Sequence, residues 1–80
     1  MSGAQMKNKV DRSIEAPGGT VCVDIFFRPD GSWGFEEYRR DTEDGRGWFP
    51  IGDYGESRFE TRQDAVLVAK KSVAWLKDAM

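Results

Sequence analysis

The chain has 80 residues, a net charge of −2, 39% hydrophobic residues and 12% aromatic residues. A domain of this length buries only about 60% of the surface of its unfolded chain, which leaves little room for an enclosed catalytic cavity. Histidine is absent, which removes the commonest general base and metal ligand, and the slight acidic excess disfavours a dedicated nucleic-acid binder.

The single cysteine, Cys22, cannot form a disulfide within the chain. Small secreted domains are usually stabilised by disulfides, so we expect a cytoplasmic protein. No apolar run approaches the roughly 18 residues of a membrane span. Residues 1–9 lack the apolar centre of a signal peptide, and no membrane association is expected.

The N-terminal residues 1–19 contain few apolar side chains and end in the turn-forming sequence Ala16-Pro17-Gly18-Gly19. This composition predicts a flexible tail with a short ordered piece around residues 10–14. Residues 20–80 are then expected to form one domain.

In residues 20–28 (TVCVDIFFR) the side-chain character alternates from one residue to the next, and β-branched and aromatic side chains are common. This pattern predicts a strand. Pro29-Asp30-Gly31 favours a type I turn closed by a glycine bulge, followed by a second strand. The register that follows sets these residues opposite each other: Phe27 and Trp33, Ile25 and Phe35, Asp24 and Glu36, Cys22 and Tyr38. A two-residue turn would instead place Glu36 in the apolar layer, so we favour the proline-led turn.

A polar loop over residues 41–47 precedes a third predicted strand, residues 48–52. We expect Phe49 and Ile51 to point inward, and Trp48 and Pro50 to point outward. Arg40 would then lie opposite Trp48 and form a cation–π pair.

Residues 62–80 show a helical pattern that begins after Thr61, a good N-cap. The expected apolar face contains Ala65, Val66, Val68, Ala69, Ser72, Val73, Leu76 and Met80, with Trp75 at its margin. The sequence therefore predicts an α+β fold: a three-stranded antiparallel β-meander with one C-terminal α-helix packed on one face. The opposite face of the sheet stays open.

None of the candidate catalytic or metal patterns is complete. Cys22 has no histidine to activate it. The acidic loop at Asp41 lacks the glycine and glutamate spacing of a calcium site. Glu36 and Glu37 are neighbours on a strand and point to opposite faces, so they cannot flank one bond. We therefore expect a protein that is not an enzyme and that needs no cofactor or metal.

The open sheet face is the candidate interaction surface, and its residues are Phe26, Arg28, Tyr38, Arg40, Arg46 and Trp48. Three large rings on one face indicate contact with a protein partner or with a second copy of the chain. DNA or RNA binding through the same face is the alternative, although the acidic net charge disfavours it. Cross-strand aromatic residues can also serve only to stabilise a sheet.

The order of elements resembles the arm-type DNA-binding domain of tyrosine recombinases and sheet-reading plant transcription-factor domains. It also resembles three-strand-plus-helix small bacterial domains of unassigned function. The resemblance covers residues 20–77 and is carried by Gly31-x-Trp33, Asp44-Gly45 and Phe59-x-Thr61-x-x-Asp64-Ala65. The recombinase resemblance implies DNA contacts from Arg28, Tyr38, Arg40 and Trp48, with Arg46 on phosphate.

Overall fold

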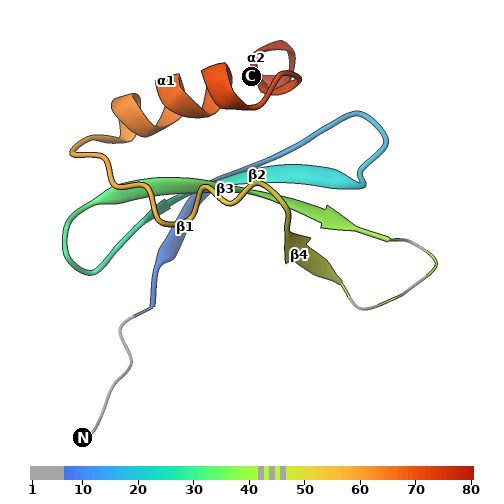
Figure 1. Cartoon of the computed structure of the whole chain (residues 1–80), viewed down its shortest axis with the longest axis horizontal. Coiled ribbons are helices and arrows are strands. Elements are labelled where there is room, and N and C mark those ends of the chain that lie inside the picture. Colours follow the sequence, from blue (N-terminus) through green and yellow to red (C-terminus); the bar gives the residue numbers. More distant parts are fainter. Residues whose placement is uncertain (1–6, 42, 44, 46) are drawn as a thin grey trace, which may run out of the picture.

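The computed structural model describes residues 7–41, 43, 45 and 47–80. Its sheet is antiparallel, with four strands in the order β1-β2-β3-β4, and the helices lie on one side of it (Figure 1). The elements are β1 (Lys9–Glu15), β2 (Val21–Phe27), β3 (Trp33–Arg40), β4 (Trp48–Pro50), α1 (Arg62–Ser72) and α2 (Leu76–Ala79). The fold class is therefore α+β.

The sheet has four strands where the sequence predicted three, because the short ordered piece expected around residues 10–14 of the tail is a strand of the sheet, β1. Ile14 is the one buried residue of this strand and lies opposite Val23 of β2. The register shifts between Val10 and Arg12, which marks a β-bulge. A strand with one buried side chain shows no apolar alternation in its sequence. The expectation for residues 1–6 lies outside the described residues.

The predicted register of the β2–β3 hairpin is confirmed. Phe27 lies opposite Trp33, and Asp24 lies opposite Glu36. The amide of Gly31 donates to the carbonyl oxygen of Arg28 at 3.0 Å, and Gly31 has a φ of 90°. A left-handed glycine at this position gives the turn that the sequence predicted.

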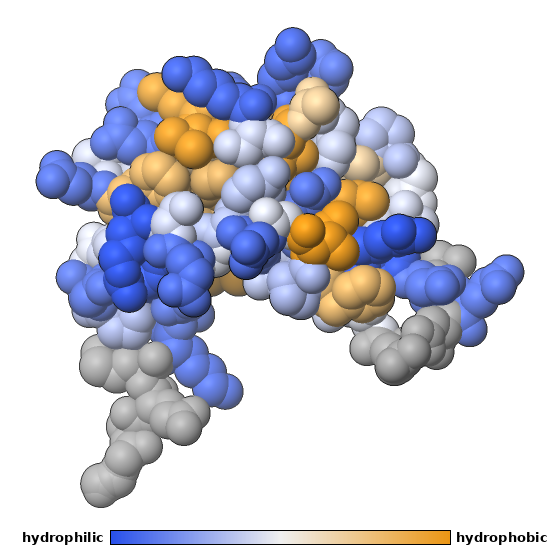
Figure 2. Space-filling view, in the orientation of Figure 1, coloured by the Kyte–Doolittle hydropathy of each residue, from blue (hydrophilic) through white to orange (hydrophobic). Residues whose placement is uncertain are grey.

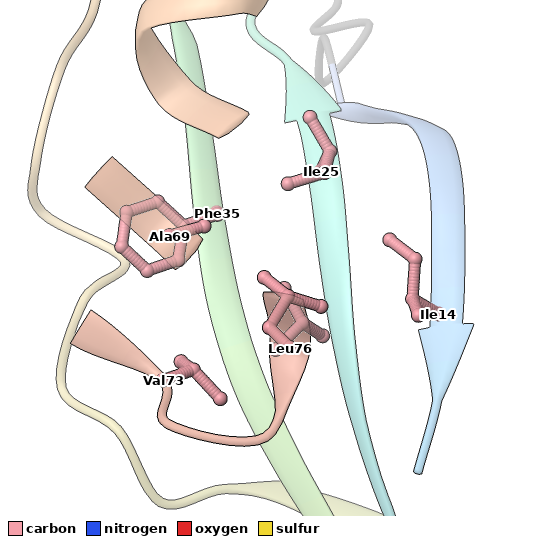
Figure 3. Close-up of a cluster of buried hydrophobic side chains, with 7 residues drawn as sticks. Ile14, Ile25, Phe35, Ala69, Val73 and Leu76 are labelled. Atoms are coloured by element: carbon pink, nitrogen blue, oxygen red, sulfur yellow. The ribbon is translucent and has the colours of Figure 1, made fainter. Parts of the chain in front are cut away.

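The hydrophobic core lies between the inner face of the sheet and the helices (Figure 3). Its buried residues are Ile14, Val23, Ile25, Phe35, Ala69, Val73 and Leu76. Ala65 and Ala69 are fully buried, and their small side chains let α1 approach the sheet closely. The buried stripe of α1 is narrower than predicted, because Val68 is 37% exposed.

The C-terminal helix is interrupted, whereas the sequence predicted a single helix. Val73 is extended, with φ −109° and ψ 105°, although its amide still donates to the carbonyl oxygen of Ala69 at 2.9 Å. The Trp75 indole Nε1 donates to Glu37 Oε2 on β3 at 3.1 Å. This interruption turns α2 so that it contacts β1.

The chain after β4 follows the edge of β3. Trp33 and Phe59 exchange two backbone hydrogen bonds, at 2.8 and 2.9 Å. The ring of Tyr54 packs on Phe35 with their centroids 4.9 Å apart, and its hydroxyl donates to the carbonyl oxygen of Ser72 at 3.2 Å. Residues 51–59 therefore join the sheet edge to the helix.

The third predicted strand is shorter than expected and its inward side chains are not buried. Phe49 and Ile51 are both exposed, because α1 and α2 contact β1, β2 and β3 and leave β4 beyond them (Figure 1). Apolar surface is visible on α1 and near β4, with hydrophilic side chains between them (Figure 2).

Candidate functional site

The outer face is the side of the sheet opposite the helices. Its residues follow from the alternation of the strands and from the observed register. They are Val10, Ser13, Glu15, Cys22, Asp24, Phe26, Gly34, Glu36, Tyr38, Arg40, Trp48 and Pro50. This face includes four of the six residues predicted as the interaction surface; Arg28 follows β2, and Arg46 lies outside the described residues.

Arg28 is a buried residue, with only 7% of its surface exposed. Its guanidinium donates to four acceptors: Ser32 Oγ, and the carbonyl oxygens of Trp33, Gly55 and Ser57. Burial lowers the pKa of the Arg28 guanidinium from its usual value. These contacts hold the loop after β4 against the sheet, so this side chain is not free to bind a partner.

Phe26 is also buried, and the Arg28 guanidinium carbon lies 4.8 Å from the centroid of its ring. The opposite residue is Gly34, where a Cβ would come within 2.7 Å of Arg28 Nη2 and 2.8 Å of the Phe26 ring. The absence of a side chain at Gly34 therefore lets Arg28 cross β3 and reach the loop.

Tyr38, Arg40 and Trp48 lie together at the other end of the outer face. Arg40 is opposite Trp48, and its guanidinium carbon lies 4.9 Å from the centroid of the indole ring. The predicted cation–π pair is therefore confirmed. Arg40 Nε also donates to the carbonyl oxygen of Gly19 at 2.9 Å. Trp48 is 37% exposed, so part of this ring remains available for contact.

A hollow of about 390 Å³ lies in the outer face between these two ends. Its lining residues are Asn8, Val10, Asp24, Phe26, Glu36, Tyr38, Pro50 and Gly55. Asp24 and Glu36 are the charged groups among them, so we name this feature the acidic hollow. The register predicted from the sequence placed the two carboxylates opposite each other. The sequence did not predict that the loop at Gly55 forms a wall of the hollow.

The two carboxylates of the acidic hollow are held by neutral donors. Glu36 is 6% exposed and accepts backbone N–H bonds from Glu37 at 2.8 Å, Tyr54 at 3.1 Å and Gly55 at 2.9 Å. Asp24 accepts a hydrogen bond from Ser13 Oγ at 2.6 Å. Among the described residues, the ion pairs are Arg58–Asp30 and Arg62–Asp11, which involve neither carboxylate.

Cys22 lies opposite Tyr38, which is one of the lining residues of the acidic hollow. Burial raises the pKa of the Cys22 thiol, and the charge of Asp24 raises it further. Burial also raises the pKa of the Tyr38 hydroxyl, with smaller effects from Asp24 and Glu36. A buried thiol with a raised pKa is a poor nucleophile.

The described part of the chain contains no group of three or more histidine, cysteine, aspartate or glutamate residues arranged to hold a metal ion. Neither α1 nor α2, the helices of the described residues, is long and apolar enough to cross a membrane. Comparison with protein-family models, curated protein sequences and solved structures finds no match to this chain.

Proposed function

We propose that the chain is a small non-enzymatic interaction module that binds another protein through its outer face. The observation that carries the proposal is the acidic hollow of about 390 Å³, in a sheet face that the helices do not cover. Aromatic side chains are enriched in protein interfaces, and Phe26 and Tyr38 belong to the lining of the hollow. The partly exposed Trp48 and its partner Arg40 extend the contact surface beyond the hollow.

A different protein fits this face better than a second copy of the chain does. A two-fold contact through one face sets the same patch of two copies against itself. It would therefore bring two acidic hollows together, and like charges directly opposite each other are destabilising. The same carboxylates oppose DNA or RNA, whose phosphates would meet Asp24 and Glu36 at a Coulombic cost.

Photo-crosslinking inside living cells tests the proposal. The photoreactive residue p-benzoylphenylalanine replaces Val10, which lines the hollow and is 57% exposed, in one full-length variant. In the control it replaces Leu67 on α1, which is 51% exposed. We expect an adduct with another protein from position 10 only, and we expect Trp48→Ala to reduce its yield.

Equal adducts from both positions would refute a specific contact through the outer face, and so would the absence of any adduct. An adduct between two copies of the chain would replace the proposed partner with self-association. Binding of an oligonucleotide that weakens steeply as salt rises would instead support the nucleic-acid alternative.

A further inference from the structure

We propose that the acidic hollow binds the cationic side chain of a lysine or arginine that the partner protein supplies. This inference rests on the proposed function and specifies the chemistry of the partner. It is argued from the charge of the hollow, the position of that charge and the nature of the walls.

The charge of the hollow has one sign. Asp24 and Glu36 are opposite each other on neighbouring strands, and they are the charged residues of the described lining. Directly opposite side chains in an antiparallel pair have Cβ atoms about 5 Å apart, so two carboxylates repel each other. A cation between them relieves that repulsion and attracts both.

The position of the negative charge is fixed by the fold. Three backbone amides hold the Glu36 carboxylate, and the residue as a whole is 6% exposed, so the position of this group is fixed. The Asp24 carboxylate accepts a hydrogen bond from Ser13 Oγ. Pre-positioned acceptors lose little conformational freedom on binding, which favours a cationic group of matching reach.

The walls of the hollow also suit a cation. Phe26 and Tyr38 contribute rings to the lining. The guanidinium of Arg28 lies 4.8 Å from the centroid of the Phe26 ring, which shows the kind of cation–π contact that such rings make. Arg28 donates to four neutral acceptors, so it keeps its charge, but it is not among the residues that line the hollow.

Both long basic side chains match this environment, because each has an apolar stem and a charged head. The stem would lie along Val10 and Pro50, and the head would meet the carboxylates. An apolar side chain would fill the space but would bring no countercharge to Glu36. An acidic side chain or a phosphate would be repelled.

Nuclear magnetic resonance of the isotopically labelled full chain tests this inference with a small probe. The probe is N-acetyl-lysine N-methylamide, and its uncharged control is N-acetyl-norleucine N-methylamide, which has a similar apolar stem. We expect the lysine probe to shift the amide signals of Asp24, Glu36, Tyr38 and Gly55, with a dissociation constant on the order of 1 mM. The norleucine probe should bind about tenfold more weakly, because it lacks the charge.

A pair of charge-matched variants locates the site. Asp24→Asn removes one charge from the hollow and keeps an oxygen that can accept from Ser13, so we expect binding of the lysine probe to weaken about fivefold. Glu15→Gln removes one charge from the same face outside the lining, and we expect less than a twofold change. The spectra of both variants report whether they remain folded.

Equal binding of the lysine and norleucine probes would overturn the inference, and so would equal losses in the two variants. Crosslinks from position 10 without any binding of the lysine probe would support the interaction module but would contradict the proposal that its hollow binds a cationic side chain. Binding of the lysine probe without crosslinks would contradict the proposed protein partner and would leave only a site for a free cationic group.

Discussion

Gly34 shows how one missing side chain shapes the outer face. Its position opposite Phe26 leaves the space through which Arg28 reaches the carbonyl oxygens of Gly55 and Ser57. These contacts hold the loop that also forms one wall of the acidic hollow. A small residue on β3 therefore supports the shape of the candidate site.

The substitution Gly34→Ala tests this role. Its Cβ would come within 2.8 Å of both Arg28 and Phe26, two buried side chains, so they must shift. We expect the free energy of unfolding to fall by about 1–3 kcal/mol, measured by urea denaturation. Gly55→Ala is the control, because a Cβ at this position would lie 3.2 Å from its nearest neighbour, Glu36 Oε2. If Gly55→Ala lowered the free energy of unfolding as much as Gly34→Ala does, this role of Gly34 would be contradicted.

Some residue pairs of the site followed from the sequence and others did not. The pairs Asp24–Glu36 and Arg40–Trp48 were predicted, because a turn sets the register and alternation carries it along the strands. The buried role of Arg28 was not predicted, because its acceptor Gly55 lies 27 residues away in a loop without periodicity.

At the scale of elements, α1 depends on its N-cap. Thr61 is extended, and its hydroxyl oxygen accepts a hydrogen bond from the amide of Asp64 at 3.1 Å. The helix covers the sheet through a narrow stripe of small residues, Ala65 and Ala69. Its first turn therefore positions the element that closes the core.

The substitution Thr61→Ala should lower the free energy of unfolding by about 1 kcal/mol, because an amide of the first turn loses its acceptor. Thermal unfolding followed by circular dichroism measures the effect. Thr61→Ser keeps the hydroxyl and should retain most of the stability; an equal loss in both variants would show that the methyl group matters rather than the cap.

Two elements were missed or changed for tertiary reasons. β1 has a single buried residue, Ile14, so its pattern is indistinguishable from that of a polar tail. The interruption after α1 has no glycine or proline to signal it. It depends instead on packing around Val73 and on the bond from Trp75 to Glu37.

At the scale of the whole molecule, burial of Cys22 and Tyr38 links stability to alkaline pH. The pKa values of both groups are raised in the folded chain, above ordinary values of 9.0 and 10.0. The unfolded chain therefore releases these protons first as the pH rises. Their contribution to stability is complete below the ordinary values and is lost as the pH rises through the raised ones.

We therefore expect the urea concentration at the unfolding midpoint to decrease as the pH is raised from about 8.5 to about 11. In this range the Cys22 and Tyr38 side chains of the unfolded chain begin to ionise. Tyr38→Phe cannot ionise and should show a shallower fall than the unaltered chain. The same slope in both chains would mean that the Tyr38 hydroxyl does not contribute.

The inner face is covered by α1 and α2, and both follow the four described strands in the chain. During synthesis the ribosome releases β1 to β4 first, while Val23, Ile25 and Phe35 have no helix to pack against. A small sheet without its packing partner has little stability in water. We therefore expect the nascent protein to be prone to aggregation until α1 has emerged, and we expect holdase chaperones to bind it during that interval.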